Sequence, residues 1–328
     1  MQLPRCRLCG DSFTPTARRQ EACRACVTVA TKQARKLVND EKMAAYLGTS
    51  GQLAAADLAS RGSVAASISS EEAVSDIGST HLKFVLWPDT HFPFHDEKAV
   101  ALGLKVVRYY KPDIVYLLGD MIDCTGFGRF KHSLTDKRTF LATELELFRE
   151  FGQRLNDASP KSTKFFIEGN HEARVEKWAM DHPQLTGLEE MDISKLLWLD
   201  KLGYANNGKT IIESELANGE LTFTHGTHTG SNKAGFAARA EMARFGTSGA
   251  SGHTHRLATY MEKSKRGVRV WIESGHMSQH QPHYMKTLPN WQQGLVIGEA
   301  ARDGNDFEME AIPFRLSYKC RVRGREIS

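Results

Sequence analysis

The chain has 328 residues, of which 41% are hydrophobic and 25% charged, a composition that allows one large core and a small accessory module. No apolar run approaches the length of a transmembrane helix, and Pro4, Arg5 and Cys6 stand where a signal peptide carries apolar residues. We therefore expect a soluble cytoplasmic protein with no membrane partner. The formal net charge is +4, but residues 1–42 carry +5 and residues 315–328 carry +4, which leaves −5 between them.

The N-terminal segment contains four of the six cysteines, arranged as two Cys-x-x-Cys pairs: Cys6, Cys9, Cys23 and Cys26. This spacing is typical of a structural zinc site, because four thiolates close a tetrahedron around the ion. We predict that residues 1–42 form a zinc-ribbon-like basic module that binds one structural Zn²⁺ and needs it to fold. Four reduced thiols in an unfolded tail are the alternative.

The basic character of residues 1–42 comes from nine Lys/Arg against four Asp/Glu. Basic side chains on a helix, such as Lys32, Arg35 and Lys36, can follow a phosphate backbone, so nucleic acid is an expected partner, as substrate or through this tether. A solvated helix face explains the same charges, and a protein partner docked on the module is a further possibility.

Residues 43–80 are predicted to be a linker, because Ala, Ser and Gly fill nineteen of the thirty-three positions from 48 to 80. The catalytic domain is expected to span residues 81–314, and residues 315–328 are expected to be a basic tail. Helical spacing of apolar residues predicts helices over 97–110 and 140–155, and shorter helices are expected over 172–180 and 235–245.

Four apolar stretches in the expected catalytic domain read as strands, over residues 83–87, 114–118, 164–168 and 221–224. Each leads into side chains with oxygen or imidazole donors, and a fifth such segment follows Gly252. The five segments are Asp89-Thr90-His91, Gly119-Asp120-Met121-Ile122-Asp123, Gly169-Asn170-His171-Glu172, Thr224-His225-Gly226 and Gly252-His253-Thr254-His255. Open α/β sheets bind ligands at the carboxyl ends of their strands, so we expect these groups to meet there.

Mixed oxygen and imidazole donors predict a dinuclear site for borderline or hard divalent metals. One Asp-x-His or Gly-His-x-His alone is weak, since histidines often serve as satisfied polar residues. Five segments in this order, each beside a predicted strand, are much more specific. Two adjacent metals can clamp the attacking and leaving oxygens of a phosphoryl centre, so the sequence predicts a hydrolase of phosphate esters.

From about residue 82 to 275 the chain resembles the calcineurin-like metallophosphoesterase superfamily, whose motifs it carries complete. The resemblance implies an α/β fold, a two-sheet β sandwich flanked by helices, with the small zinc module as an addition. It implies that one metal is held by Asp89, His91 and His255, and the other by Asn170, His225 and His253. Asp120 would bridge the two ions.

The resemblance also implies that His171 is the proton donor or a phosphate contact. Asp123 or Glu172 would fix its tautomer, with Asp123 as the expected partner. Mn²⁺ is the expected activating metal, with Fe²⁺, Zn²⁺, Ni²⁺ and Co²⁺ as alternatives. Arg174 and His276 are candidate substrate contacts. For Arg174 an exposed helix arginine is equally plausible, and for His276 a polar loop with histidines is the more common explanation.

The arginines with which serine/threonine protein phosphatases clamp phosphate are missing, because Glu168 precedes Gly169, and Cys124 and Thr125 follow Asp123. Protein phosphatase activity is therefore not expected. The basic zinc module favours a phosphodiesterase or nuclease acting on nucleic acid. A phosphomonoesterase or small-molecule phosphodiesterase, with the zinc module docking a protein, is the alternative. A non-catalytic scaffold fits poorly, since no ligand position is lost.

Overall fold

A computed structural model describes residues 81–128, 140–182, 184, 187–208, 211–213, 216–228, 233–265, 267–281, 288–301 and 306–328. All of them belong to one unit, Ile77–Ser328. The expected zinc module with its four cysteines and the expected linker lie outside the described residues.

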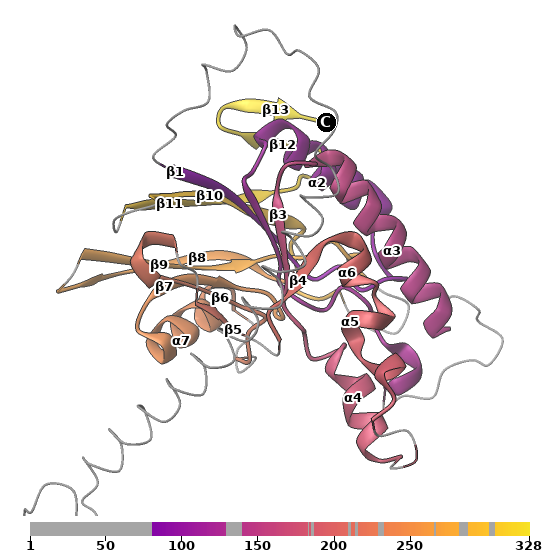
Figure 1. Cartoon of the computed structure of the whole chain (residues 1–328). Coiled ribbons are helices and arrows are strands. Elements are labelled where there is room, and N and C mark those ends of the chain that lie inside the picture. The colour runs from indigo at the N-terminus through magenta and orange to yellow at the C-terminus, as the bar shows by residue number, and fades with distance from the viewer. Residues whose placement is uncertain are drawn as a thin grey trace, which may run out of the picture. The chain divides into compact units, whose positions relative to one another are not determined.

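The first sheet has six strands in the order β11-β10-β1-β2-β3-β4 (Figure 1). Their bounds are β1 His81–Trp87, β2 Ile114–Leu117, β3 Thr163–Phe166, β4 Tyr204–Asn206, β10 Gly294–Ala301 and β11 Phe307–Pro313. Strands β1 to β4 are parallel, whereas β10 is antiparallel to both β1 and β11. The expected strands at 83–87, 114–118 and 164–168 correspond to β1, β2 and β3.

The second sheet has five strands in the order β5-β6-β7-β9-β8. Their bounds are β5 Ile211–Glu213, β6 Leu221–Thr224, β7 Ser248–Ser251, β8 Leu257–Ser264 and β9 Gly267–Ser274. Strands β6, β7 and β9 are parallel to one another, and the two edge strands run antiparallel to their neighbours. Five of the parallel strands, β1, β2, β3, β6 and β7, carry the polar segments at their carboxyl ends.

Side chains of β1 alternate between two cores, because successive residues of a strand point to opposite faces. Phe84 and Leu86 join a cluster that includes Phe223 and Ile272 from the second sheet, so this core lies between the sheets. Val85 and Trp87 belong to another cluster, which joins the first sheet to helices α2, Glu97–Tyr110, and α3, Leu141–Ala158. The two sheets therefore form a sandwich.

Helices cover both outer faces of the sandwich (Figure 1). Helix α2, Glu97–Tyr110, is capped by Asp96, whose side chain accepts from the backbone N–H groups of Lys98 and Ala99, and it packs with α3, Leu141–Ala158, on the first sheet. Helix α7, Phe236–Phe245, packs on Trp271 of the second. The remaining elements are α4 Ala173–Met180, α5 Ile193–Leu196, α6 Leu199–Leu202 and the 3₁₀ turns η1 Thr125–Phe127, η4 Glu189–Met191 and η5 Leu216–Gly219.

The last fourteen residues differ from the expected tail. Strands β12, Cys320–Val322, and β13, Arg325–Ile327, form a hairpin. Cys320 and Val322 are fully buried in the core that contains α2 and α3. Apolar residues alternate with the charges of this segment, so its composition indicated only a basic tail.

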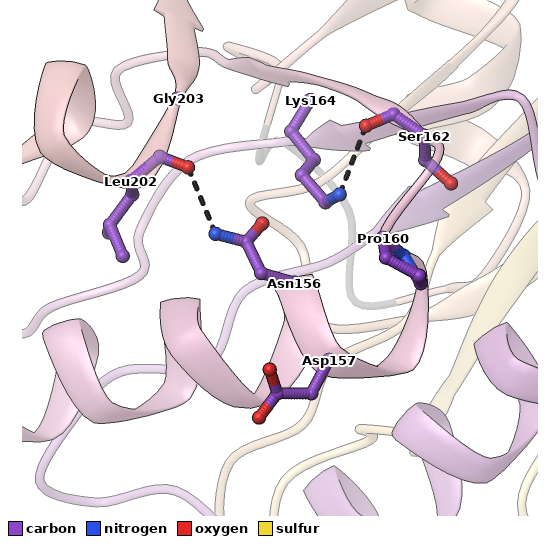
Figure 2. A pocket seen from close by; sticks show the side chains of 7 residues that line it. All are labelled: Asn156, Asp157, Pro160, Ser162, Lys164, Leu202 and Gly203. Carbon is purple, nitrogen blue, oxygen red and sulfur yellow. Dashed lines mark hydrogen bonds between the residues drawn. The ribbon is translucent and has the colours of Figure 1, made fainter. Parts of the chain in front are cut away.

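The architecture is a mixed α/β fold in which two sheets are flanked by helices, and the expected fold class is confirmed. Among the described residues, no helix has the length and apolar character needed to cross a membrane. A polar hollow of about 380 Å³ lies at the start of β3 and β4, where Asn156 and Lys164 line it (Figure 2). Their amide and ammonium groups are bonded to backbone carbonyls, and the hollow is at the opposite strand ends from the polar segments.

Candidate active site

The five polar segments follow β1, β2 and β3 of the first sheet and β6 and β7 of the second. The structure brings their side chains together at the seam between the two sheets. Three overlapping groups of potential metal ligands result: Asp89, His91 and His255; His91, Asp120 and His171; and Asp120, His225 and His253. Within each group the ligand atoms lie within 4.8 Å of one another.

The first group is centred on Asp89, which is fully buried. Its Oδ2 atom lies 3.2 Å from Nε2 of His255 and 3.9 Å from Nε2 of His91. Both carboxylate oxygens also accept from the backbone N–H of His253 at 3.0 Å. The Asp89 carboxylate thus contacts the segment that carries both His253 and His255. Because Asp89 follows a strand of the first sheet and this segment follows a strand of the second, the contact holds the two sheets together here.

The group on the other side of Asp120 contains His225 and Asn170. Nε2 of His225 lies 3.3 Å from Oδ2 of Asp120 and 3.0 Å from Oδ1 of Asn170. Nδ1 of His225 lies 2.8 Å from the carbonyl of Leu118, so a proton on Nδ1 leaves Nε2 free to act as a ligand. Oδ2 of Asp120 is also 3.8 Å from Nε2 of His91. Asp120 therefore stands between the two ligand sets.

The donor atoms fit a pair of divalent cations. Nε2 of His91 and Nε2 of His255 face each other at 2.9 Å, and a cation can be shared by two such lone pairs. The three groups contain only carboxylate and imidazole donors, which suit borderline and hard divalent metals.

The charged groups between the two sheets also favour a bound cation. Burial alone would raise the pKa of the Asp120 carboxyl, but the imidazoles of His225 and His171 hold that pKa well below its usual value. Burial alone would lower the pKa of His225, but Asp120 raises that pKa to about 10. The region between the two sheets therefore favours positive charge beside Asp120. A proton on His225 supplies that charge, and a bound metal cation would supply it as well.

Several candidate ligands have a backbone conformation that is rare for residues with a Cβ. His91, Asp120, His253 and His255 have φ angles of 54°, 51°, 69° and 57°. Positive φ in such residues costs on the order of 1–3 kcal/mol each and is concentrated at functional sites. Gly252 adds a close approach, because a Cβ at this position would overlap Oδ1 of Asp89.

His171 lies beside both ligand groups. Its Nδ1 atom is 2.8 Å from the carbonyl of Asp123 and 3.2 Å from that residue's Oδ1, and its Nε2 atom is 3.8 Å from Oδ2 of Asp120. The contact with Asp123 is the one expected from the sequence. The same Oδ1 atom is also 3.2 Å from Nδ1 of His91, a double contact that the sequence did not indicate.

Arg174 is at the site, as the sequence suggested. Its guanidinium donates to the carbonyl of Asp123 and to Nε2 of His171, both at 2.9 Å. His276 differs from the expected rim position, because it is fully buried and its ring stacks beneath that of His255 with centroids 5.3 Å apart. Ser278 bonds its Nδ1 atom at 2.7 Å. The structure thus places the His276 ring against His255 and away from the surface.

Glu172 has a different role from the one considered in the sequence, since it does not orient His171. Its carboxylate is buried and accepts from the backbone N–H groups of Asp120, Met121, Ile122 and Gly169 at 2.7–3.1 Å. It therefore fixes the loop after β2 against the loop after β3. Burial and the neighbouring Asp120 raise the pKa of Glu172 to about 7. The sequence held no signal for this role beyond a glutamate in the motif.

The chain matches the calcineurin-like phosphoesterase family over residues 82–257 and belongs to it. The enzyme is therefore a hydrolase that acts on phosphoric ester bonds, in a family whose members typically bind two divalent metal ions. It is similar to the Gene 54 protein of Mycobacterium phage D29, with 27% identity over 256 residues, 70% of this chain and 93% of that protein. The Gene 54 protein of Mycobacterium phage L5 is 26% identical over 266 residues, 73% of this chain and 98% of that protein.

Proposed function

We propose that this metallophosphoesterase is a phosphodiesterase or nuclease that acts on nucleic acid. The phosphoesterase chemistry rests on one observation: a single carboxylate, Asp120, contacts both ligand groups, and His171 lies next to it. In this arrangement Asp89, His91 and His255 would hold one metal, and Asn170, His225 and His253 would hold the other. Asp120 serves both, and Mn²⁺ is the proposed activator, with Fe²⁺, Zn²⁺, Ni²⁺ and Co²⁺ as alternatives.

The metal pair, when bound, supplies Lewis acidity that offsets charge on the phosphoryl oxygens and lowers the pKa of water. The protein's own groups orient the proton donor. Asp123 holds Nδ1 of His171, so that Nε2 faces the site and can give a proton to the leaving oxygen.

Arg174 is proposed to bind a non-bridging phosphate oxygen. Its guanidinium now donates to Nε2 of His171, at 2.9 Å. An anionic substrate attracts the guanidinium more strongly than a neutral imidazole does, because charge-assisted hydrogen bonds are about twice as strong as neutral ones. Substrate binding would then free Nε2 of His171 to take up the proton that it later donates. Burial opposes this protonation, but Asp120 and Asp123 raise the pKa of His171 above its usual value and so favour the imidazolium.

Nucleic acid as the substrate is supported by the charge excesses of residues 1–42 and 315–328 in an otherwise acidic chain. The proposed zinc module, held by Cys6, Cys9, Cys23 and Cys26, would add affinity for the phosphate backbone without taking part in catalysis. A protein partner at the module is the alternative.

The test is an activity panel with the full-length, metal-loaded enzyme. It compares a chromogenic diester, the matching monoester, and single- and double-stranded DNA and RNA. Cleavage of the diester and of at least one nucleic acid, lost after chelation and restored by Mn²⁺, is the expected result. Cleavage of the monoester alone would replace the proposal with a phosphomonoesterase function, and full turnover after chelation would reject the metal mechanism.

A further inference from the structure

We infer that Thr125, supported by Glu144, is a positioning residue that fixes the Asp123 carboxylate, and that this one carboxylate orients a metal ligand and the proton donor together. The inference rests on the proposed function, because it takes His171 as the donor of the proton to the leaving group. Neither Thr125 nor Glu144 belongs to a motif of the family described above.

The Asp123 carboxylate is held at both of its oxygens. Oδ1 lies 3.2 Å from Nδ1 of His91 and 3.2 Å from Nδ1 of His171. Oδ2 accepts from the hydroxyl of Thr125 at 2.8 Å. Rotation of the carboxylate would therefore break the contact with Thr125 and at least one contact with an imidazole. Asp123 is 7% exposed, so water has little access to replace these partners.

Thr125 is held in turn by α3. It is 1% exposed in the short turn η1, and its backbone N–H donates to Oε1 of Glu144 at 3.0 Å. Glu144 is fully buried, and its Oε2 atom has no hydrogen-bond partner within the described part of the chain. A buried carboxylate with an unpartnered oxygen opposes folding. Its Oε1 atom accepts from the loop that carries Asp123, which indicates a role in that loop.

The two imidazoles share the Asp123 carboxylate, but the functions proposed for them depend on it to different extents. Nδ1 of His91 contacts Oδ1 of Asp123, and Nδ1 of His171 contacts the same oxygen and the Asp123 carbonyl. If His91 shifts, Asp89 and His255 remain as ligands of its group, whereas proton donation has His171 alone. Loss of the Thr125 hydroxyl should therefore disturb proton donation more than metal binding.

The chemical step at stake is protonation of the leaving group. As the P–O bond breaks, its electron pair stays with the leaving oxygen, which takes the proton from Nε2 of the His171 imidazolium and leaves the ring neutral. A p-nitrophenolate leaving group is stable without that proton, whereas an alkoxide is not. Misplacement of His171 should thus slow diesters with alkyl leaving groups selectively, which a merely structural defect would not do.

The experiment compares Thr125→Val, Thr125→Ala and Thr125→Ser in the full-length, metal-loaded enzyme, with one p-nitrophenyl diester and one dialkyl diester. We expect Val and Ala to lower kcat for the dialkyl diester roughly 10-fold more than for the p-nitrophenyl diester, with two metals per chain retained. Ser restores the hydroxyl and should recover most of the activity on both. Glu144→Gln keeps an acceptor for the N–H of Thr125 and should change the ratio of the two rates little.

Thr222→Val is the matched control. Thr222 lies near the start of β6, outside the three ligand groups, and the substitution removes its buried hydroxyl, which is hydrogen-bonded to the hydroxyl of Thr247. It should leave the ratio of the two rates unchanged. Equal losses on both diesters in the Thr125 variants, or loss of metal, would overturn the positioning role and leave the proposed function intact. Failure of the unsubstituted enzyme to cleave either diester would instead overturn the proposed function, and this inference with it.

Discussion

Asp120 is the residue on which the two ligand groups depend most. It follows β2 with a φ of 51°, its Oδ2 atom is within 4 Å of His91, His171 and His225, and its Oδ1 atom accepts from the backbone N–H of His171 at 2.8 Å. No other candidate ligand belongs to two of the groups and also bonds the backbone of the third motif.

Replacing Asp120 with Asn should therefore reduce activity more than replacement of any other single ligand, because one change weakens both metals. The expected result is loss of measurable diesterase activity together with loss of at least one metal per chain, measured by elemental analysis. Asn170→Ala, which touches one ligand set, is the comparison. A greater loss in that variant would argue against a shared role for Asp120.

His171→Asn tests the proposed proton donor. The variant should retain about two metals per chain and lose roughly 10²–10⁴-fold in turnover, the usual range for general acid–base assistance. Since His171 also lies within ligand distance of His91 and Asp120, loss of a metal ion in this variant would assign its ring to the metals instead.

The free energy of unfolding should depend on pH through Glu144. Burial raises the pKa of this carboxyl from 4.5 to about 7, so the folded protein holds its proton more tightly than the unfolded chain does. The stabilisation from that proton is fully present below about pH 4.5 and is lost as pH rises through about 7. Glu144→Gln carries no such charge and should gain about 3 kcal/mol in free energy of unfolding, relative to the parent, between pH 4.5 and pH 8. Urea unfolding at the two pH values measures this difference, and parallel pH dependences would contradict it.

For single residues, the sequence predicted the side chains that directly follow a strand. It did not predict contacts between residues of different elements. Asp89, Asp120 and His225 follow apolar stretches directly, so their convergence could be expected. The link from Thr125 to Glu144 crosses from a loop to a helix, and no periodicity reports it. His276 was misplaced because a polar loop with several histidines looks exposed, while its backbone in fact pairs beside Asp89 and buries the ring.

The loops after β2 and β3 act as one element, because Glu172 accepts four backbone N–H groups from them. Glu172→Ala leaves these donors buried without a partner, and each unsatisfied group costs about 1–3 kcal/mol. We expect a loss of at least about 3 kcal/mol in free energy of unfolding and weaker metal binding. Glu150→Ala, at an exposed position of α3, should change stability by less than about 0.5 kcal/mol. Equal effects of the two variants in urea unfolding would contradict the role of Glu172.

Elements with long apolar patterns were predictable, and short ones were not. The helix expected over residues 97–110 has those bounds in the structure, because its buried positions recur at helical spacing and Asp96 caps it. Strands β12 and β13 have three residues each, too few for a pattern to stand out among the charges. The sandwich itself came from the family resemblance, since no strand pattern says which sheet a strand joins.

For the whole molecule, the proposed division of labour can be tested by truncation. A chain that starts near residue 78 keeps every described residue and should hydrolyse a small chromogenic diester as fast as the full chain. It should bind DNA or RNA more weakly, and the difference should shrink as salt rises, because phosphate contacts release counterions. Equal binding of the two proteins at low salt would argue against a nucleic-acid tether in residues 1–42 and favour a protein partner.

The two ligand sets draw on both halves of the sandwich: Asp89 and Asp120 follow strands of the first sheet, while His225 and His255 follow strands of the second. Metal ions bound at the seam would therefore act as removable cross-links between the sheets. Anything that binds only the folded state stabilises it in proportion to the logarithm of its free concentration, once that exceeds the dissociation constant. The supply of metal would then set how firmly the two sheets are held together, as well as how fast the enzyme turns over.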